Sequence, residues 1–383
     1  MIGNIYEKSN YRLLVILPVA LMLVGLYFIP HIQLDQSLRG GILVQVQTQT
    51  QYDIKALTGQ VDGAIPGAQA SIASSPGGIA ITLAENASIS QANQNLLNIG
   101  KLYDNYTNST ARLAQYLLIP ASSRNSTVQQ LISAERRNES SQVSMMASNL
   151  TREVSLLAPF YKPPQQANQS ASSMYSTATN AYANSTAAYR SFVVSKLGGI
   201  IPLTPASYSY KEITYAEASI FQADLTQIVI VAFVLVAIVV FLIFRTPIPA
   251  FAVVFGAGND FIVALGAMGA FGIPLGVASA GGLLMLIGYS IDTDLLSSIR
   301  ILKRTEGTAT GRAMATMKTG ITMTAAAIIS FGVLFIVSYI YFIPTYLQIS
   351  GVVLAGLAAD ILTTWFANVP MILWYKHRKE GHR

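Results

Sequence analysis

Six long apolar runs limit this chain to one class of fold. A helix needs about 20 residues to cross the hydrocarbon core of a bilayer. A composition with 52% hydrophobic and 11% charged residues supplies several such segments. We therefore predict a polytopic α-helical membrane protein with six transmembrane helices. The predicted spans are 12–30, 224–244, 248–271, 276–299, 320–341 and 346–374.

The first run has the basic start and apolar centre of a signal peptide, which is the alternative to a retained span. No small-x-small cleavage site precedes His31. The run is also long enough to cross the bilayer. We therefore expect it to remain as the first transmembrane helix.

Basic residues gather at alternate ends of the predicted spans, which places them all on one side of the membrane. By the positive-inside rule that side is the cytoplasm. The predicted topology has a cytoplasmic N-terminus (1–11), a basic cytoplasmic tail (375–383) and a large external segment (31–223). The basic residues on this side are Lys8, Arg12, Arg245, Arg300, Lys303, Arg304, Arg312, Lys318, Lys376, Arg378, Lys379 and Arg383.

The external segment begins with the pattern of a small α+β head. Residues 42–46 contain apolar side chains in alternation, as in a half-buried strand. Residues 53–64 predict a short helix with Asp53 as its N-cap. Residues 68–74 and 78–83 predict a hairpin around Pro76-Gly77.

From residue 86 to residue 198 the sequence becomes rich in Asn, Ser, Gln, Ala and Tyr, with apolar residues at helical spacing. We predict a helical insertion that projects from the head. Its N-x-S/T triplets are glycosylation acceptors if they face an external compartment, although so Ser/Thr-rich a tract also forms such triplets by chance. They begin at Asn86, Asn105, Asn108, Asn125, Asn138, Asn149, Asn168 and Asn184.

Acidic residues lie inside three of the predicted spans: Asp260 in the third, Asp292 and Asp294 in the fourth, and Asp360 in the sixth. A charge in hydrocarbon costs at least a few kcal/mol, so such residues usually face a cavity, a partner helix or an ion path. We predict that these acids, with Arg300 near the inner interface, form a proton or sodium relay. The alternative is that they only fix the packing of the helices.

Helical geometry separates the two acids of the fourth span. Asp292 and Asp294 lie about 200° apart around the helix, so one is expected to face this bundle and the other a partner. Arg300 lies about 80° from Asp292 over two turns, near enough to reach partway back. Asn259 and Tyr289 are expected to be hydrogen-bonding neighbours of the acids.

The residue content argues against several enzyme classes. Cysteine is absent, which excludes disulfides and thiolate chemistry. His31, His377 and His382 all lie outside the predicted spans, and neither HExxH nor GxSxG occurs. We therefore expect no enzymatic activity, no metal centre, and no cofactor other than a proton or sodium as the coupling ion.

Four stretches of the predicted membrane domain resemble a known family. They are VVFLIFRTPIPAF (239–251), GNDFIVALGAMGAFGIPLGVAS (258–279), IGYSIDTDLLSSIRILKR (287–304) and GVVLAGLAADILTTWFANVPMILW (351–374). Together they are similar to the SecF family of protein-export membrane proteins in its archaeal form, which belongs with SecD to the resistance–nodulation–division superfamily. The order of one span, a large external loop and five clustered spans also matches that family.

The resemblance implies a multi-pass protein of the cell membrane with a ferredoxin-like external head. It implies assembly with SecD and a SecY-type channel, and export of an unfolded secretory polypeptide driven by ion flow. Contact of the basic inner loop with membrane lipid is a secondary expectation, and no nucleic acid is expected as a partner. The rival interpretations are a small-molecule efflux subunit of the same superfamily and a non-conducting scaffold of the translocation channel.

The sequence departs from the family pattern at two places. LDQSLRGG (34–41) is closer to SecD, and the insertion (86–198) has no counterpart in the compact family head. Arg39, Gly40 and Gly41 are expected to shape the start of the first head strand, with contact to the exported polypeptide as the alternative.

Overall fold

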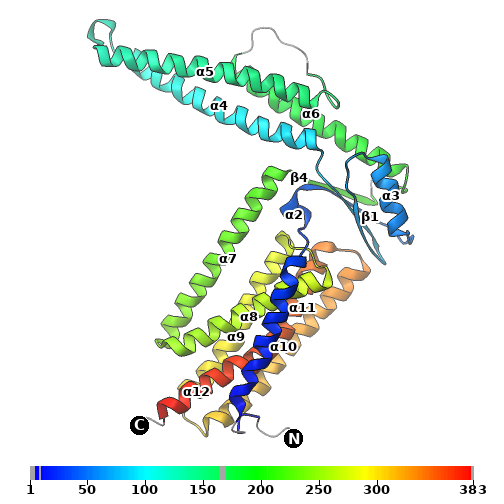
Figure 1. Cartoon of the computed structure of the whole chain (residues 1–383), viewed down its shortest axis with the longest axis vertical. Helices are drawn as coiled ribbons and strands as arrows, with labels where there is room; N and C mark the ends of the chain where they lie inside the picture. Colours follow the sequence, from blue (N-terminus) through cyan, green and yellow to red (C-terminus); the bar gives the residue numbers. More distant parts are fainter. Residues whose placement is uncertain (1–4, 8–9, 164–169, 205, 381–383) are drawn as a thin grey trace.

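A bundle of long helices carries an α/β head and a helical arm at one end, and both chain ends lie at the other (Figure 1). The computed structural model describes residues 5–7, 10–163, 170–204 and 206–380. Lys8, Asn168, His382 and Arg383, which the sequence analysis named, lie outside the described residues. The bundle helices are α1 (Ile16–Phe28), α7 (Tyr215–Phe244), α8 (Pro247–Phe271), α9 (Val277–Lys303), α10 (Ala309–Ile340), α11 (Pro344–Thr363) and α12 (Val369–Glu380).

Six helical stretches of the described chain are long and apolar enough to cross a membrane, as the sequence predicts. Their bounds differ from the predicted ones where capping residues extend them. Helix α7 begins at Tyr215 because Thr214 and Glu217 form a capping box ahead of the apolar run. Helix α10 begins at Ala309 because the Thr308 side chain accepts from the Gly311 backbone.

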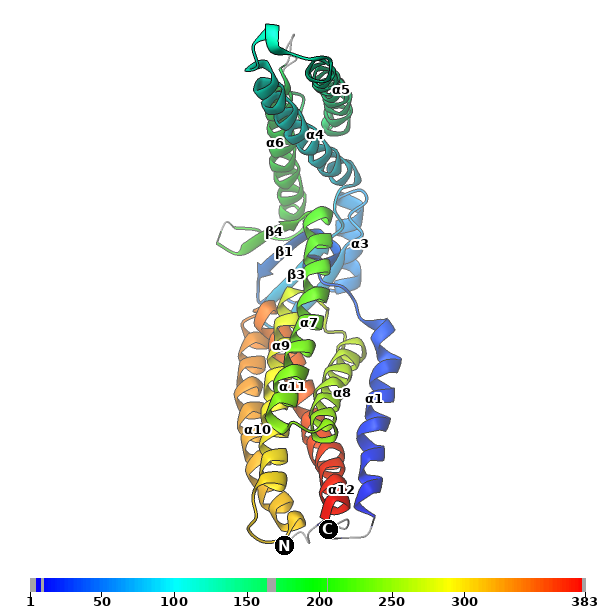
Figure 2. The same cartoon turned by 90° about the vertical axis from the view of Figure 1, so that its left-hand side faces the viewer.

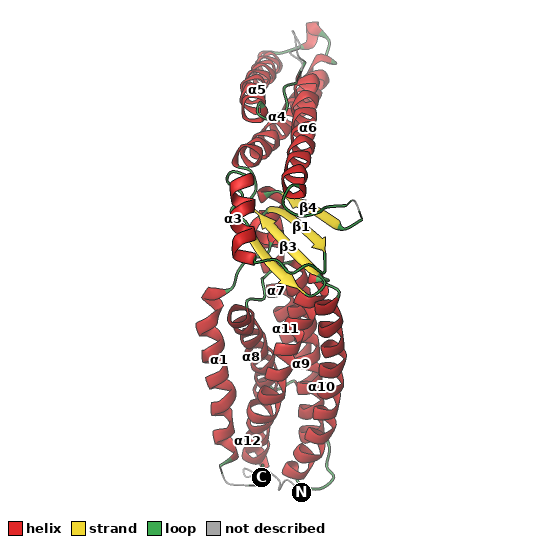
Figure 3. Cartoon of the chain, turned by 90° about the vertical axis from the view of Figure 1, so that its right-hand side faces the viewer, coloured by secondary structure: helices red, strands yellow, loops and turns green. Residues whose placement is uncertain are grey.

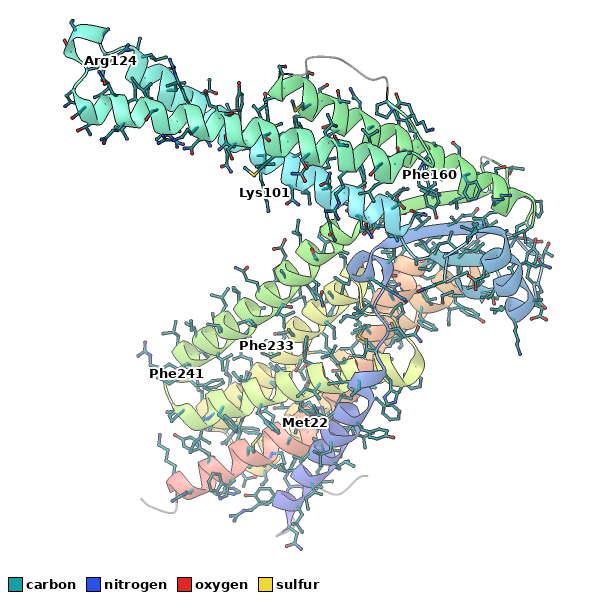
Figure 4. The ribbon with its side chains drawn as sticks, turned by 45° about the horizontal axis from the view of Figure 1, so that its top comes forward. Met22, Lys101, Arg124, Phe160, Phe233 and Phe241 are labelled. Atoms are coloured by element: carbon teal, nitrogen blue, oxygen red, sulfur yellow. The ribbon has the colours of Figure 1, made fainter. Side chains whose placement is uncertain are left out.

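Helices α8, α9 and α11 form the centre of the bundle, and at least half of each apolar stretch is buried. Helices α1, α7 and α10 are peripheral and expose most of their apolar surface, as Figure 2 shows for α1 and α7. Phe233 of α7 meets Phe261 of α8 edge to face, with ring centroids 5.4 Å apart, whereas Phe241 points away from the bundle (Figure 4). Any intramembrane site therefore has to be built on the three central helices.

The head contains a four-stranded antiparallel sheet in the order β2-β3-β1-β4. One sheet face packs its apolar side chains against helix α3, and the other face lies toward the bundle (Figure 3). The fourth strand was not predicted from the sequence. The elements are β1 (Gly41–Gln47), α3 (Ile54–Ala64), β2 (Ser71–Ser75), β3 (Gly78–Leu83) and β4 (Tyr208–Ile213).

A short helix, α2 (Gln36–Arg39), leads into the first strand. Gly40 and Gly41 have φ angles of 78° and 116°, which glycine adopts without a side-chain clash. The Gln36 side chain donates to the Gly41 carbonyl at 2.6 Å and to the Lys211 carbonyl at 2.8 Å. The glycines therefore turn the chain into β1, and Gln36 joins β1 to β4.

Three helices form the insertion between β3 and β4: α4 (Ala87–Leu117), α5 (Ser126–Leu157) and α6 (Ala171–Gly198). Helices α4 and α5 form a long hairpin whose tip holds Arg124 (Figures 2 and 4). Of the described triplet asparagines, Asn86 and Asn149 are half-buried and the other five are exposed. The exposed ones are Asn105, Asn108, Asn125, Asn138 and Asn184.

Two of the contacts between the described head and the bundle hold the backbones close together. The Asp35 amide donates to the Leu275 carbonyl at 2.6 Å, and the Ser37 hydroxyl accepts from the Val277 amide at 3.0 Å. These bonds hold the α2 linker, which is the segment that leads from α1 through α2 into β1, against the start of α9. At the second place, Gly77 in the β2–β3 turn packs against the backbone at Ile340, where any side chain would collide.

A buried acid lies in the core of the arm. Glu153 of α5 is fully buried, and its Oε2 accepts from Asn95 Nδ2 of α4 at 2.9 Å. Its Oε1 has no hydrogen-bond partner among the described residues. Burial raises the pKa of Glu153 to about 7, because the ionised form loses its water.

We predict that acid stabilises this arm. The pKa of Glu153 is higher in the folded arm than its unfolded value of about 4.3. The stabilisation of the arm by protonated Glu153 is therefore fully present below the unfolded pKa and is lost as pH rises through about 7. The free energy of unfolding should fall by roughly 3 kcal/mol across this range. Hydrogen exchange of the full chain should show stronger protection of α4 and α5 at about pH 5 than at about pH 8, after correction for intrinsic rates. Glu153→Gln should remove the difference. An equal difference in that variant would contradict the assignment to Glu153.

Candidate functional site

Three acids from the three central helices meet inside the bundle. Asp260 of α8, Asp294 of α9 and Asp360 of α11 are all fully buried. Ser290 Oγ donates to Asp260 Oδ2 at 2.7 Å. Thr364 Oγ1 lies 2.7 Å from Asp294 Oδ1 and 3.1 Å from Asp360 Oδ1. Thr364 thus joins Asp294 to Asp360, and Ser290 on the same helix as Asp294 bonds to Asp260, so the three acids form one cluster linked through hydroxyl groups.

A second layer of polar side chains fixes the helices around the cluster. Asn259 Nδ2 donates to Thr363 Oγ1 at 2.6 Å, which joins α8 to α11. Asn368 Nδ2 donates to the Asp294 backbone carbonyl at 3.4 Å. The Ser298 hydroxyl donates to the same carbonyl at 2.6 Å. These bonds hold α8, α9 and α11 in register at the level of the acids.

A π-helical turn, Thr364–Asn368, joins α11 to α12 at this level. Pro370 follows it, and a proline cannot donate the backbone bond that would close the preceding turn as an α-helix. The wider turn presents Thr364 to two acids and Asn368 to the backbone of α9. Single π-turns inside α-helices occur frequently at functional sites.

The cluster has no counter-charge among the residues that the structure describes. Within the described part of the chain, none of the three carboxyl groups forms an ion pair with a basic side chain. One oxygen of each, namely Asp260 Oδ1, Asp294 Oδ2 and Asp360 Oδ2, has no hydrogen-bond donor there. Across all the described residues, there is no group of three or more His, Cys, Asp or Glu side chains that could hold a metal ion.

The other predicted relay residues lie elsewhere. Asp292 is exposed on the outer side of α9, as its separation from Asp294 around the helix requires. Arg300 does not reach back to it, and its Nη1 donates to Thr319 Oγ1 of α10 at 3.3 Å. Tyr289 is 42% exposed and packs edge to face on Phe331, so the expectation that it neighbours the acids was wrong.

The hydroxyl and amide groups that connect the acids were not predicted from the sequence. Ser290, Thr363, Thr364 and Asn368 were not singled out, yet each bonds to the cluster or to its neighbours. The stretch TTWFANVP (363–370) could have indicated three of them, because it places polar residues and a proline inside an apolar span.

Most of the membrane domain matches the sequence model of a known protein family. Residues 205–378 match the sequence model of the family described as "Protein export membrane protein SecD/SecF, C-terminal". The matched region contains all three acids and the π-helical turn. This part of the chain, from strand β4 to helix α12, therefore resembles the SecD/SecF family.

The relatives that it resembles carry the description "Protein-export membrane protein SecF". The one from Methanothermobacter thermautotrophicus is 50% identical over 139 residues, which is 36% of this chain and 48% of the relative. Those from Pyrococcus furiosus and Methanocaldococcus jannaschii are 40% and 41% identical over 37% and 36% of this chain, and 47% and 49% of the relatives. The matched part thus spans about half the length of these curated SecF relatives.

The packing at Asp294 yields a stability prediction. A side chain at Gly256 of α8 would collide with the Asp294 carboxyl group, whereas one at Gly258 would meet open space. Gly256→Ala should push Asp294 off Thr364 and lower the free energy of unfolding by roughly 1–3 kcal/mol. Gly258→Ala is the matched control and should leave it unchanged or slightly raise it. Thermal unfolding of the two variants in detergent measures this, and equal midpoints would contradict the packing.

Proposed function

We propose that this chain is a SecF-like subunit of a SecD–SecF complex that assists protein export across the cytoplasmic membrane. In this proposal the cluster of Asp260, Asp294 and Asp360 carries the coupling ion, a proton or sodium. The observation that supports it is the burial of three clustered carboxyl groups that have no basic partner among the described residues. Burying ionised carboxylates costs several kcal/mol each even when they are paired, so a bound proton or cation is the natural neutralising charge.

The contacts of Thr364 favour a cluster that exchanges protons. A hydroxyl group has one proton to donate and can accept through its lone pairs. Thr364 Oγ1 is within hydrogen-bonding distance of both Asp294 and Asp360. Both contacts are hydrogen bonds only when one of these acids carries a proton and donates it to Thr364. The hydroxyl thus provides a route for a proton between α9 and α11.

The same helices connect the cluster to the head. Helix α9 carries Asp294 and Ser290, and its first turn is bonded to the α2 linker through Val277 and Ser37. A shift of α9 when the cluster gains or loses an ion is therefore transmitted to the head. The membrane potential supplies about 2.3 kcal/mol per charge per 100 mV for such a step. The head would act in turn on the unfolded polypeptide that leaves a SecY-type channel.

The placement of the chain in the membrane follows from charge. Arg245, Lys303, Arg304 and Lys376 lie at the bundle end opposite the head, where both chain ends also lie (Figure 1). By the positive-inside rule we place this end in the cytoplasm and the head outside. There the exposed asparagine triplets of the arm would be open to glycosylation. The exposed faces of α1, α7 and α10 remain for lipid and for SecD.

The strand order of the head supports the proposal that the head has the ferredoxin-like architecture of the family. Its strand order, β2-β3-β1-β4, comes from a chain in which α3 connects β1 to β2 and the arm helices connect β3 to β4. A split βαβ arrangement of this kind defines the ferredoxin-like motif. The arm is then an enlarged version of the second crossover helix.

Paired substitutions on α9 test the proposal. Asp294→Asn keeps the shape of the side chain but cannot exchange a proton, so export of a secreted reporter should fall to the level of a deletion. Asp292→Asn is the matched control, because it makes the same change on the exposed side of the same helix. A pull-down with SecD checks that both variants assemble.

Normal export by an assembled Asp294→Asn variant would contradict ion coupling at this cluster. The chain would then be a scaffold of the translocation channel. An equal loss in both variants would show that export depends on charge along α9 in general and not on the buried cluster.

A further inference from the structure

A buried tyrosine from the N-terminal segment lies in an apolar layer beside the acid cluster. Tyr6 is 1% exposed, although it precedes the first membrane helix. The layer contains side chains from α8, α9, α10 and the end of the sixth span. Its buried members besides Tyr6 include Ala252, Ile301, Ala313, Trp365, Val369 and Ile372.

This layer lies on the side of the acids that faces the chain termini, since Ala252 precedes Asp260 on α8 and Ile301 follows Asp294 near the end of α9. On α8, Ala252 lies one turn before Gly256, which contacts Asp294. On the sixth span, Val369 directly follows Asn368, which bonds to the Asp294 backbone. The layer therefore begins about one helical turn, or about 5 Å, from the cluster.

Tyr6 is attached to the same π-helical turn that contacts the acids. Its hydroxyl donates to the Trp365 backbone carbonyl at 2.9 Å, and it lies 3.8 Å from Met317 Sδ. Trp365 is next to Thr364, which contacts Asp294 and Asp360. The Trp365 indole packs so closely on Gly320 of α10 that a side chain there would collide with it.

The opposite side of the cluster is also covered. Met268, Leu283, Leu286, Val352 and Leu357 form a second apolar cluster between the acids and the head. The acids are thus enclosed from both ends of the bundle. A coupling ion has to pass one apolar cluster to enter and the other to leave.

We propose that Tyr6 and Trp365 form a plug that closes the acid cluster to water and ions from the terminal end of the bundle. This inference rests on the proposed function, since it takes the cluster to be the ion site. Opening requires the Tyr6 hydroxyl to release the Trp365 carbonyl and the ring to leave the layer. Release also frees the turn that holds Thr364 against two acids, so access from this end and loss of the ion occur together.

Cysteine accessibility tests the plug, because the natural chain has no cysteine. Ser298→Cys places a thiol in the buried shell of Asp294, and Leu286→Cys places one in the apolar cluster on the head side. The full chain with SecD is labelled in inside-out membrane vesicles, with a charged, impermeant methanethiosulfonate reagent added to the terminal end.

Tyr6→Ala should raise the labelling rate of Ser298→Cys by about tenfold or more, because it increases the population of the open state. Tyr6→Phe, which loses only the hydrogen bond, should give a smaller rise. Tyr27→Ala is the matched control, since it removes an exposed tyrosine from α1. It should leave the rate unchanged. Leu286→Cys should remain unlabelled in every background.

An unchanged rate at Ser298→Cys in the Tyr6→Ala background would overturn the plug. Labelling of both thiols would overturn it too, since Tyr6 would then hold the whole bundle together. The readout is access and not export. A failed plug therefore leaves the export result for Asp294→Asn intact, and a failed export result leaves the labelling result interpretable.

Discussion

The contacts of Thr364 with Asp294 and Asp360 join two central helices where carboxyl groups are fully buried, and burying such groups is costly unless they are hydrogen-bonded. Around them the bundle supplies further hydroxyl and amide groups from three helices, and the π-helical turn brings two of these groups to the same level. The small residue at Gly256 lets α8 approach Asp294 closely. The arrangement of α8, α9 and α11 therefore follows from the need to surround three carboxyl groups.

The remaining parts of the chain are positioned by these central helices. The head is tied to the start of α9 and to the α10–α11 turn. The N-terminal segment is tied to the π-helical turn through Tyr6. The central helices thus contact the head at one end and the apolar layer around Tyr6 at the other, with the acids between them. In the proposed function, a change of charge at the acids would act on both ends of the bundle through these contacts.

Much of this architecture is encoded locally and could be predicted from the sequence. Run length identifies the six spans, and Asp53 and the Pro76-Gly77 pair mark a helix start and a hairpin. Strand β4 was missed because its partner, β1, lies more than 150 residues earlier, and pairing at that distance leaves no local pattern. The arm was predicted as helical because its apolar residues keep a helical period.

The site was less predictable, for a physical reason. Helical geometry shows that Asp292 and Asp294 face opposite ways, but not which one faces inward. The rotation of a helix about its axis is set by its neighbours, and here Gly256 and Thr364 select Asp294. The burial of Tyr6 in the bundle could not be predicted from the sequence, because an aromatic residue ahead of a membrane span usually lies at the membrane interface.

The most direct test of the account is ion flux through the full chain with SecD in liposomes under an imposed membrane potential. The account predicts proton or sodium uptake in the wild type and its loss in Asp360→Asn. It predicts no loss in Asp224→Asn, which changes an exposed acid on α7. Flux that persists in Asp360→Asn would show that the buried cluster does not carry the ion.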